Sequence, residues 1–219
     1  MKVNTDGVLL GALLSADKPA AILDIGTGTG VIALMLAQRF PDAQIDAVEI
    51  DYDAAQTAQQ NLENSIFTNR LKLYHSSFEN FSTNSPEHKY DLIVSNPPFF
   101  LNALHNPEEK KVIARHASES LFENLTTFVK QHLKPSGQAC FILPNVAATE
   151  VIERGLNKGL NLRKRINIRS SLIKPQHRSL IALGFDRVQP MEESFIIYES
   201  EKLYSEEYRD ALKDFLTIF

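Results

Sequence analysis

Residues 22–30 read Ile-Leu-Asp-Ile-Gly-Thr-Gly-Thr-Gly, an apolar run that passes directly into three glycines at alternate positions. The apolar part is typical of a buried strand, and the residues after the glycines favour a helix. Glycine lets the backbone turn sharply and lets a ligand approach closer than a Cβ atom would allow. Tight strand-to-helix turns also use glycine for packing alone, so this motif predicts a ligand-binding turn only if its surroundings agree.

The chain around this turn alternates short β-rich runs with longer helical stretches, which is the pattern of βαβ units. Strands are predicted at 21–26, 44–50, 71–75, 90–95 and 138–143. Helices are predicted at 30–40, 52–64 and 119–133, the last of them ended by Pro135 and Gly137. We therefore predict an α/β fold with a doubly wound, mostly parallel sheet, in which ligands bind at the carboxyl ends of the strands.

The pattern changes after Pro144. A helix is predicted at 147–158, followed by β-like segments at 162–169, 179–186 and 194–198. The tail, 205–219, is predicted to be an amphipathic helix with a packing role, because apolar residues recur every three or four positions at Tyr208, Leu212, Phe215 and Phe219. Residues 81–89 are predicted to form a polar loop. We expect one domain over 1–219, with an N-terminal segment (1–20), a core (21–145) and a C-terminal part that completes the sheet (146–219).

Length and composition are those of an ordinary soluble protein. Of the 219 residues, 43% are hydrophobic and 23% are charged, which indicates neither disorder nor a membrane protein. No apolar run approaches the roughly 20 residues of a spanning helix, and the N-terminus lacks the apolar region of a secretory signal, so we expect a cytoplasmic protein. Cys140 is the only cysteine, which excludes an intrachain disulfide and a cysteine-rich zinc site; we predict an inert buried thiol and no metal.

Two acidic residues give the glycine turn the context of a cofactor site. Asp24, just before the glycines, can face the ammonium group of a ligand. Glu49 ends the next predicted strand, where a carboxylate can accept hydrogen bonds from both hydroxyls of a ribose. It could instead cap the following helix, although Asp51 is the better candidate for that role. The spacing of the predicted cofactor-binding glycines differs from the G-x-G-x-x-G of dinucleotide folds; they are Gly26, Gly28 and Gly30.

A second motif follows the fourth predicted strand, where residues 95–100 read Ser-Asn-Pro-Pro-Phe-Phe. Two prolines cannot extend a central strand, because they fix φ and remove backbone donors. A rigid turn would account for the prolines. It would not account for the asparagine before them and the aromatic residues after them, at the edge of the sheet where a cofactor would lie.

These residues suit the chemistry of a planar amino group. Asn96 Oδ1 and the Pro97 carbonyl can both accept hydrogen bonds from an NH2 group while Phe99 stacks on the attached ring. Holding both protons draws the nitrogen lone pair out of conjugation and directs it toward an electrophile. Catalysis would then rest on orientation, with a ceiling of about 7–11 kcal/mol, and on stabilisation of the charge that develops on nitrogen. We predict that Asn96, Pro97 and Phe99 are catalytic.

Over residues 20–145 the glycine turn and Glu49 resemble the class I S-adenosylmethionine-dependent methyltransferases. The resemblance implies a Rossmann-like sheet of seven strands and S-adenosylmethionine as the cofactor. In that family the residues after the third strand cradle the cofactor's adenine, often through an acid; this sequence has Ser76-Ser77-Phe78 there, and Ser77 is the predicted contact. The Asn-Pro-Pro-Phe motif resembles the signature shared by adenine-N6, guanine-N2 and glutamine-amide methyltransferases.

Two further stretches resemble a narrower family, the bacterial tRNA(Val) adenine-N6 methyltransferases, so that the resemblance covers nearly the whole chain. They are residues 1–11, Met-Lys-Val-Asn-Thr-Asp-Gly-Val-Leu-Leu-Gly, and residues 114–121, Ala-Arg-His-Ala-Ser-Glu-Ser-Leu. The resemblance implies methyl transfer to N6 of the adenine beside the anticodon, with tRNA as the partner and no obligate protein partner. It also implies that Thr5 lies at the cofactor and Arg115 at the substrate. The family usually carries a β segment before the first stretch, so we expect this sequence to be shortened relative to the family.

The distribution of charge supports a polyanionic substrate independently of this resemblance. The net charge is −4, but the stretch between Glu153 and Asp186 holds no acidic residue and eight basic ones, which are Arg154, Lys158, Arg163, Lys164, Arg165, Arg169, Lys174 and Arg178. Phosphate contacts by such a patch would give affinity without sequence information. On charge alone, a solvated and partly structural basic face is an equal alternative. The predicted substrate contacts are Arg163, Lys164, Arg165 and Arg169, with Pro98, Phe100 and Arg115.

Other functions stay open at the level of the sequence. An rRNA guanine-N2 methyltransferase would share the Asn-Pro-Pro motif, and so would a glutamine-amide methyltransferase that acts on a release factor. The latter normally has a helical N-terminal substrate domain, for which the sequence shows no counterpart. A non-enzymatic RNA-binding protein on a degenerate fold would not need intact glycines, Glu49 and Asn96.

Overall fold

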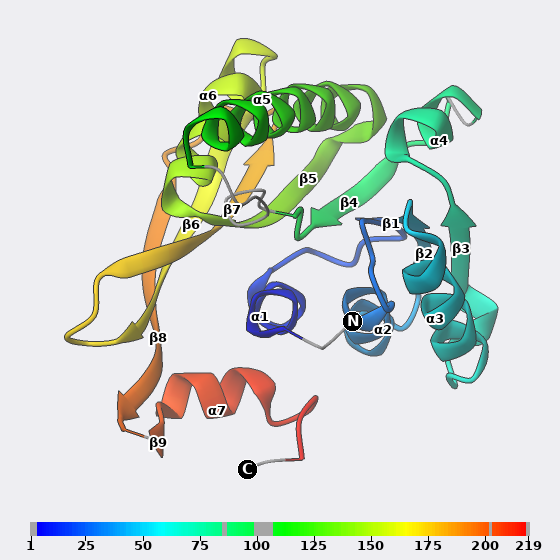
Figure 1. Ribbon diagram of the computed structural model, residues 1–219. Helices are drawn as coiled ribbons and strands as arrows, with labels where there is room; N and C mark the ends of the chain where they lie inside the picture. Colours follow the sequence, from blue (N-terminus) through cyan, green and yellow to red (C-terminus); the bar gives the residue numbers. More distant parts are fainter. Residues whose placement is uncertain (1–3, 85–86, 99–106, 202, 218–219) are drawn as a thin grey trace.

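A mixed sheet forms the centre of the molecule (Figure 1). The computed structural model describes residues 4–84, 87–98, 107–201 and 203–217, without the side chains of 107–118. Its strands are β1 (Ala21–Ile25), β2 (Gln44–Glu49), β3 (Leu71–His75), β4 (Tyr90–Ser95), β5 (Leu133–Pro144), β6 (Asn161–Ser171), β7 (Gln176–Gly184), β8 (Met191–Ser200) and β9 (Leu203–Tyr204). Its helices are α1 (Thr5–Leu13), α2 (Val31–Arg39), α3 (Tyr52–Glu63), the 3-10 turn η1 (Thr68–Arg70), α4 (Phe78–Asn84), α5 (Pro107–His132), α6 (Asn145–Asn157) and α7 (Glu206–Leu212).

The nine strands of the described residues lie in the order β3-β2-β1-β4-β5-β7-β6-β8-β9. The first five are mutually parallel, whereas β7 is antiparallel to both of its neighbours, β5 and β6. The predicted doubly wound, mostly parallel α/β fold is therefore confirmed. The expected number of seven strands was too low, because β8 continues the sheet beyond β6 and β9 adds an antiparallel edge of two residues.

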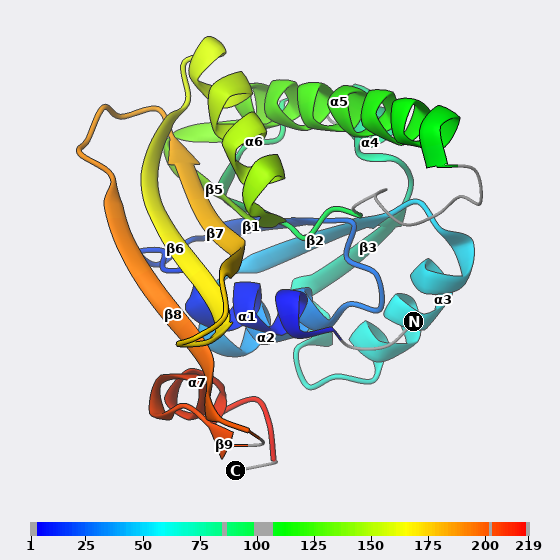
Figure 2. The ribbon, with the colours of Figure 1, turned by 60° about the vertical axis from the view of Figure 1, so that its left-hand side comes forward.

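Helices cover both faces of the sheet, with α1, α2 and α3 on one side and α4, α5 and α6 on the other (Figures 1 and 2). Each layer encloses its own apolar core. Along β1, Ile22 packs into the core under α1 and α2, and Leu23 and Ile25 pack into the core under α5. Successive side chains of a strand point to opposite faces, so a strand buried on both faces is apolar throughout. This explains why Ile22–Ile25 is an almost unbroken apolar run.

Helix α1 was not predicted within the N-terminal segment. Asn4 caps it, with its side-chain oxygen accepting a hydrogen bond from Gly7 N–H at 2.7 Å. Five consecutive residues, Gly7–Gly11, are buried, so the helix has little polar surface and its sequence lacks amphipathic periodicity. Only its packing between α2 and the sheet makes it recognisable as a helix.

The predicted polar loop over 81–89 was wrong in its first part, because residues 78–84 form α4. Phe81 is only 3% exposed and packs edge-on against Tyr74, with ring centroids 4.8 Å apart. Phe78 and Phe81 are the only large apolar residues of this polar stretch, and one pair at helical spacing is too short a pattern to predict a helix.

Helix α5 begins earlier than predicted, at Pro107, and ends at His132. The helix ends three residues before Pro135, as expected because proline cannot continue a helix. Gly137 has another role, since a Cβ atom there would lie 2.9 Å from the carbonyl oxygens of both Tyr90 and Asp91. It allows β5, which already begins at Leu133, to approach β4 closely.

The tail helix α7 is shorter than the predicted 205–219, and Phe219 lies outside the described residues. Tyr208 and Leu212 are buried in the first core, which confirms a packing role for this helix. Cys140 is 1% exposed, and burial raises its thiol pKa to about 12, as expected for an inert thiol. Within the described part of the chain, no helix combines the length and apolarity needed to cross a membrane.

Candidate active site

The glycine turn between β1 and α2 forms one wall of a cavity at the carboxyl edge of the sheet. Gly26, Gly28 and Gly30 have φ values of 69°, 62° and 84°, which L side chains rarely adopt. A Cβ atom at Gly26 would meet nothing within 4 Å, so conformation alone requires glycine there. At Gly30 a Cβ atom would also come within 3.2 Å of Leu62, so this glycine serves packing as well.

Asp24 lies fully buried just before this turn. One carboxylate oxygen accepts a hydrogen bond from Thr27 Oγ1 at 2.6 Å, and the other, Oδ1, has no hydrogen-bond partner among the described residues. Burial raises the pKa of this carboxyl group to about 7. The cavity wall itself is made by the next residues, Ile25–Thr29, so contact between Asp24 and a ligand ammonium stays a prediction.

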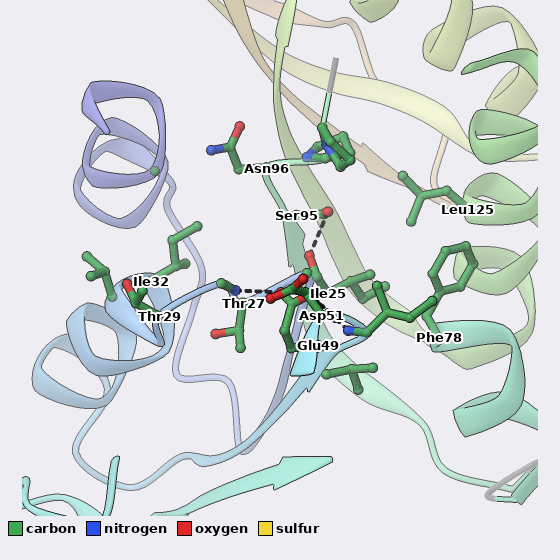
Figure 3. Close-up of a pocket in the computed structure, with 18 of the residues that line it drawn as sticks. Ile25, Thr27, Thr29, Ile32, Glu49, Asp51, Phe78, Ser95, Asn96 and Leu125 are labelled. Carbon is green, nitrogen blue, oxygen red and sulfur yellow. Dashed lines mark hydrogen bonds between the residues drawn. The ribbon is translucent and has the colours of Figure 1, made fainter. Parts of the chain in front are cut away.

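Glu49 lines the cavity at the end of β2 and is held there by the backbone. Its Oε2 accepts a hydrogen bond from Gly28 N–H at 2.8 Å, and its Oε1 accepts from the N–H groups of Ile50 and Asp51, both at 2.9 Å (Figure 3). The helix cap is Asp51, whose side chain accepts from Ala54 N–H. Glu49 is therefore not the cap of α3, and its carboxylate ties the end of β2 to the glycine turn.

Asn96 and Pro97 follow β4 and face the same cavity (Figure 3). Ser95 Oγ donates a hydrogen bond to the Ile25 carbonyl at 2.8 Å, which fastens the end of β4 to the start of the glycine turn. Asn96 Nδ2 points toward α1 and donates to Asn4 Oδ1 at 3.4 Å. Among the described residues no group donates to Asn96 Oδ1, so this orientation leaves it as an acceptor for a substrate amine. Phe99 and Phe100 lie outside the described residues.

The cavity has a volume of about 810 Å³ and is lined by residues as far apart in the sequence as Asn4 and Arg178. The sequence missed several of its lining residues. Asn4 and Asp6 come from α1, and Asp6 forms an ion pair with Arg178 of β7 at 2.9 Å, so the site is closed on one side by elements far apart in sequence. Thr5, between them, is exposed. The stretch 1–11, which contains these residues, carried a family resemblance but did not place Asn4 and Asp6 at the cavity, because that depends on how α1 packs.

The wall near the start of α4 is formed by Ser76, Ser77, Phe78 and Glu79. Ser77 is thus where the resemblance predicted it. The sequence missed Glu79, which supplies an acid one residue past the stretch where the family often has one. Its Oε1 accepts a hydrogen bond from Asn124 Nδ2 at 3.2 Å.

The four basic residues predicted to bind substrate do not form one cluster. Arg163 is paired with Asp186, and Lys164 with Glu193. Arg165 Nε donates to Ser179 Oγ at 3.2 Å, and Arg169 Nε is buried without a hydrogen-bond partner among the described residues. Because β6 and β5 are both antiparallel to β7, β6 runs in the direction of β5, so only its end reaches the edge that bears the cavity.

Charges that are adjacent in sequence are therefore spread over a strand, with about 20 Å between residues 163 and 169 at the usual rise per residue. Arg163 lines a separate hollow with Asp91 and Ser136, at the opposite edge of the sheet. The side chain of Arg115, in α5, lies outside the described part of the structure.

Comparisons with known proteins agree with this geometry. The family model for the methyltransferase small domain matches residues 3–146. A "tRNA1(Val) (adenine(37)-N6)-methyltransferase" of Pedobacter heparinus is 46% identical over 219 residues, which are 100% of this chain and 92% of the relative. A protein of the same name from Proteus mirabilis is 38% identical, covering 98% of this chain and 87% of the relative.

A crystal structure titled as a predicted O-methyltransferase of Agrobacterium tumefaciens shares the fold. It has a TM-score of 0.74 at 19% identity and covers 95% of this chain and 96% of its own. The family model covers all of the cavity-lining residues except Arg178, and the two relatives extend over nearly the whole chain. The chain therefore belongs to the methyltransferase small domain family and, within it, to the family of the tRNA1(Val) (adenine(37)-N6)-methyltransferases.

Proposed function

We propose that this protein transfers a methyl group from S-adenosylmethionine to N6 of an adenine in tRNA, at position 37 of tRNA1(Val), the activity for which its relatives are named. The observation that carries this proposal is the shared cavity. Asn96 and Pro97 open into it from β4, and the glycine turn and Glu49 line it from β1 and β2. We further propose that residues 1–219 act as one methyltransferase domain and that the protein works in the cytoplasm.

The residues around the cavity fit S-adenosylmethionine. A volume of about 810 Å³ is within the range of small-molecule sites. Glu49 presents a carboxylate for ribose hydroxyls, Ile50 and Phe78 offer apolar surface for a purine, and the unpartnered oxygen of Asp24 suits a nearby cationic group. When bound, this cofactor supplies an electrophilic methyl group on a sulfonium.

The protein's own residues would orient the amine. Asn96 Oδ1 and the Pro97 carbonyl accept hydrogen bonds from the two protons of adenine N6, which directs the nitrogen lone pair toward the cofactor. Asn4 favours this arrangement. Its side-chain oxygen accepts from Asn96 Nδ2, which keeps the amide oxygen of Asn96 turned away from α1. The apolar side chains of Leu121 and Leu125 cover the cavity from α5 and limit water. No strong base is required, because orientation and electrostatic stabilisation supply the rate.

The substrate must present an unstacked adenine, which an RNA loop does more readily than a duplex. Of the predicted basic residues on β6, Arg169 lies near the carboxyl end of the strand and Arg165 lies one residue before its midpoint, and Arg178 lines the cavity itself. These side chains would contact phosphates next to the target nucleotide.

The test is methyl transfer from labelled S-adenosylmethionine into total tRNA, rRNA and total protein in separate reactions, with nucleoside analysis of the labelled RNA. We expect the label in tRNA, as N6-methyladenosine. Label in protein would favour the glutamine-amide reaction, and label in guanosine of rRNA would favour the guanine-N2 reaction; either result would contradict the proposal.

A further inference from the structure

The turn between β6 and β7 exposes aliphatic side chains close to the proposed substrate entrance. Leu172 is 66% exposed and Ile173 is 91% exposed, and the turn projects from the side of the molecule in Figure 1. Arg178, which lines the cavity, lies five to six residues further along the same hairpin. The tip is thus on the order of 10–20 Å from the cavity along the strand, a distance that one to a few nucleotides can span.

The base of this hairpin is fixed by side-chain hydrogen bonds. Asn145 Nδ2 donates to the Gln176 carbonyl at 2.9 Å, and Ser179 Oγ donates to Asn145 Oδ1 at 3.1 Å. Gln176 Nε2 also donates to Asn167 Oδ1 across the hairpin, and the Asp6–Arg178 ion pair joins it to α1. The aliphatic tip is therefore presented on a rigid arm, and Val146, 84% exposed, lies beside its base.

Charges of both signs lie around the tip. Lys174 lies in the turn itself, and Arg169 lies three residues before Leu172. The neighbouring strand β8 pairs Tyr198 with Ser171, so the exposed Glu199 and Glu201 at its end also lie close to the turn. Two isolated aliphatic side chains among charges are a poor match for the apolar core of a protein interface, which is depleted in charge. They suit a nucleic acid, whose bases offer apolar faces, and the hairpin that bears them continues to Arg178 at the cavity.

We propose that Leu172 and Ile173 form a wedge that packs against the bases flanking the target adenine. This inference rests on the proposed function and adds how the substrate is opened. Extruding a base exposes the faces of its neighbours, and apolar side chains that cover those faces recover part of the lost stacking. Lys174 and Arg169 then hold the adjoining phosphates.

The experiment compares the parent with a Leu172→Ser/Ile173→Ser variant on a synthetic RNA stem-loop that carries an unpaired adenine in its loop. Ile66→Ser is the matched control, because Ile66 is 92% exposed and lies in the turn before β3, at the opposite edge of the sheet. Affinity for the stem-loop is measured by fluorescence anisotropy, KM and kcat by methyl transfer, and affinity for S-adenosylmethionine by calorimetry. We expect the double variant to bind the stem-loop about tenfold more weakly and to have a KM about tenfold higher, with the parent's affinity for S-adenosylmethionine. The Ile66→Ser variant should match the parent in all of these quantities.

A second RNA separates a base contact from any other contact. When the nucleotides flanking the adenine are abasic, the parent and the double variant should bind equally well, because the wedge has nothing to cover. The inference is overturned if the double variant binds intact RNA like the parent, if its loss persists on abasic RNA, or if light scattering shows that it changes the oligomeric state instead. Absence of methyl transfer by the parent would refute the proposed function alone, since the binding comparison does not depend on turnover.

Discussion

At the end of β4, one amide group is placed to orient the substrate. Asn96 Oδ1 is left free to accept a hydrogen bond while Nδ2 faces Asn4, and the Pro97 carbonyl lies next to it in the chain. We predict that Asn96→Ala reduces kcat by about a hundredfold or more, the scale for losing one positioned polar group at a reacting centre. Calorimetry should show S-adenosylmethionine affinity within a few fold of the parent. Near-normal turnover would contradict the role of Asn96.

Asp24 makes the stability of the cofactor-free protein depend on pH. Burial raises its pKa to about 7 in the folded protein from 3.8, so the folded state holds a proton that the unfolded state has released. Stability should therefore fall as the pH rises from about 4 to about 7, and level off above. Asp24→Asn, which is neutral and can still accept from Thr27, should flatten this dependence and be more stable than the parent at pH 8. Urea unfolding at several pH values measures the free energy of unfolding of both proteins. Parallel curves of this free energy against pH would contradict the role of Asp24.

At the scale of elements, Glu49 joins the end of β2 to the β1–α2 turn through three backbone N–H groups. Glu49→Ala should weaken cofactor binding by about 1.5–3 kcal/mol, as expected for lost hydrogen bonds to a charged group. It should also lower the free energy of unfolding, because the N–H groups lose their acceptor.

A control separates these two effects. Ser205 caps α7 by accepting from Tyr208 N–H, far from the cavity. Ser205→Ala should cost about 1 kcal/mol of stability and leave cofactor affinity unchanged. If calorimetry gave the same cofactor affinity for Glu49→Ala as for the parent, Glu49 would not be the ribose contact.

At the scale of the molecule, the arrangement of charge predicts how tRNA binding responds to salt. Arg165→Ala/Arg169→Ala should reduce the slope of log affinity against log salt by roughly one to two units, because each phosphate contact contributes about 0.7–0.9. Arg163→Ala/Lys164→Ala, of equal charge, should change it less, since Asp186 and Glu193 already pair with these side chains. Filter binding at several salt concentrations distinguishes the two variants. Equal slopes in both would show that Arg165 and Arg169 do not form the phosphate surface.

The sequence by itself determined the α/β class, the positions of the five parallel strands along the chain and the two motifs at their carboxyl ends. These are local signals, because glycine with positive φ, consecutive prolines and fully apolar strands follow from the conformational limits of a few neighbouring residues. The same local logic identified Asp51, rather than Glu49, as the cap of α3.

Only the tertiary structure decided which distant residues meet. The sequences of α1 and α4 carry too little helical periodicity to predict either helix. The packing of α1 brought Asn4 beside Asn96 and Asp6 beside Arg178. The basic stretch appeared continuous in sequence, but a strand's rise of about 3.3 Å per residue carries its charges from one edge of the sheet to the other. Adjacency in sequence determines local conformation, whereas the pairing direction of β6 decides which of its side chains reach the cavity.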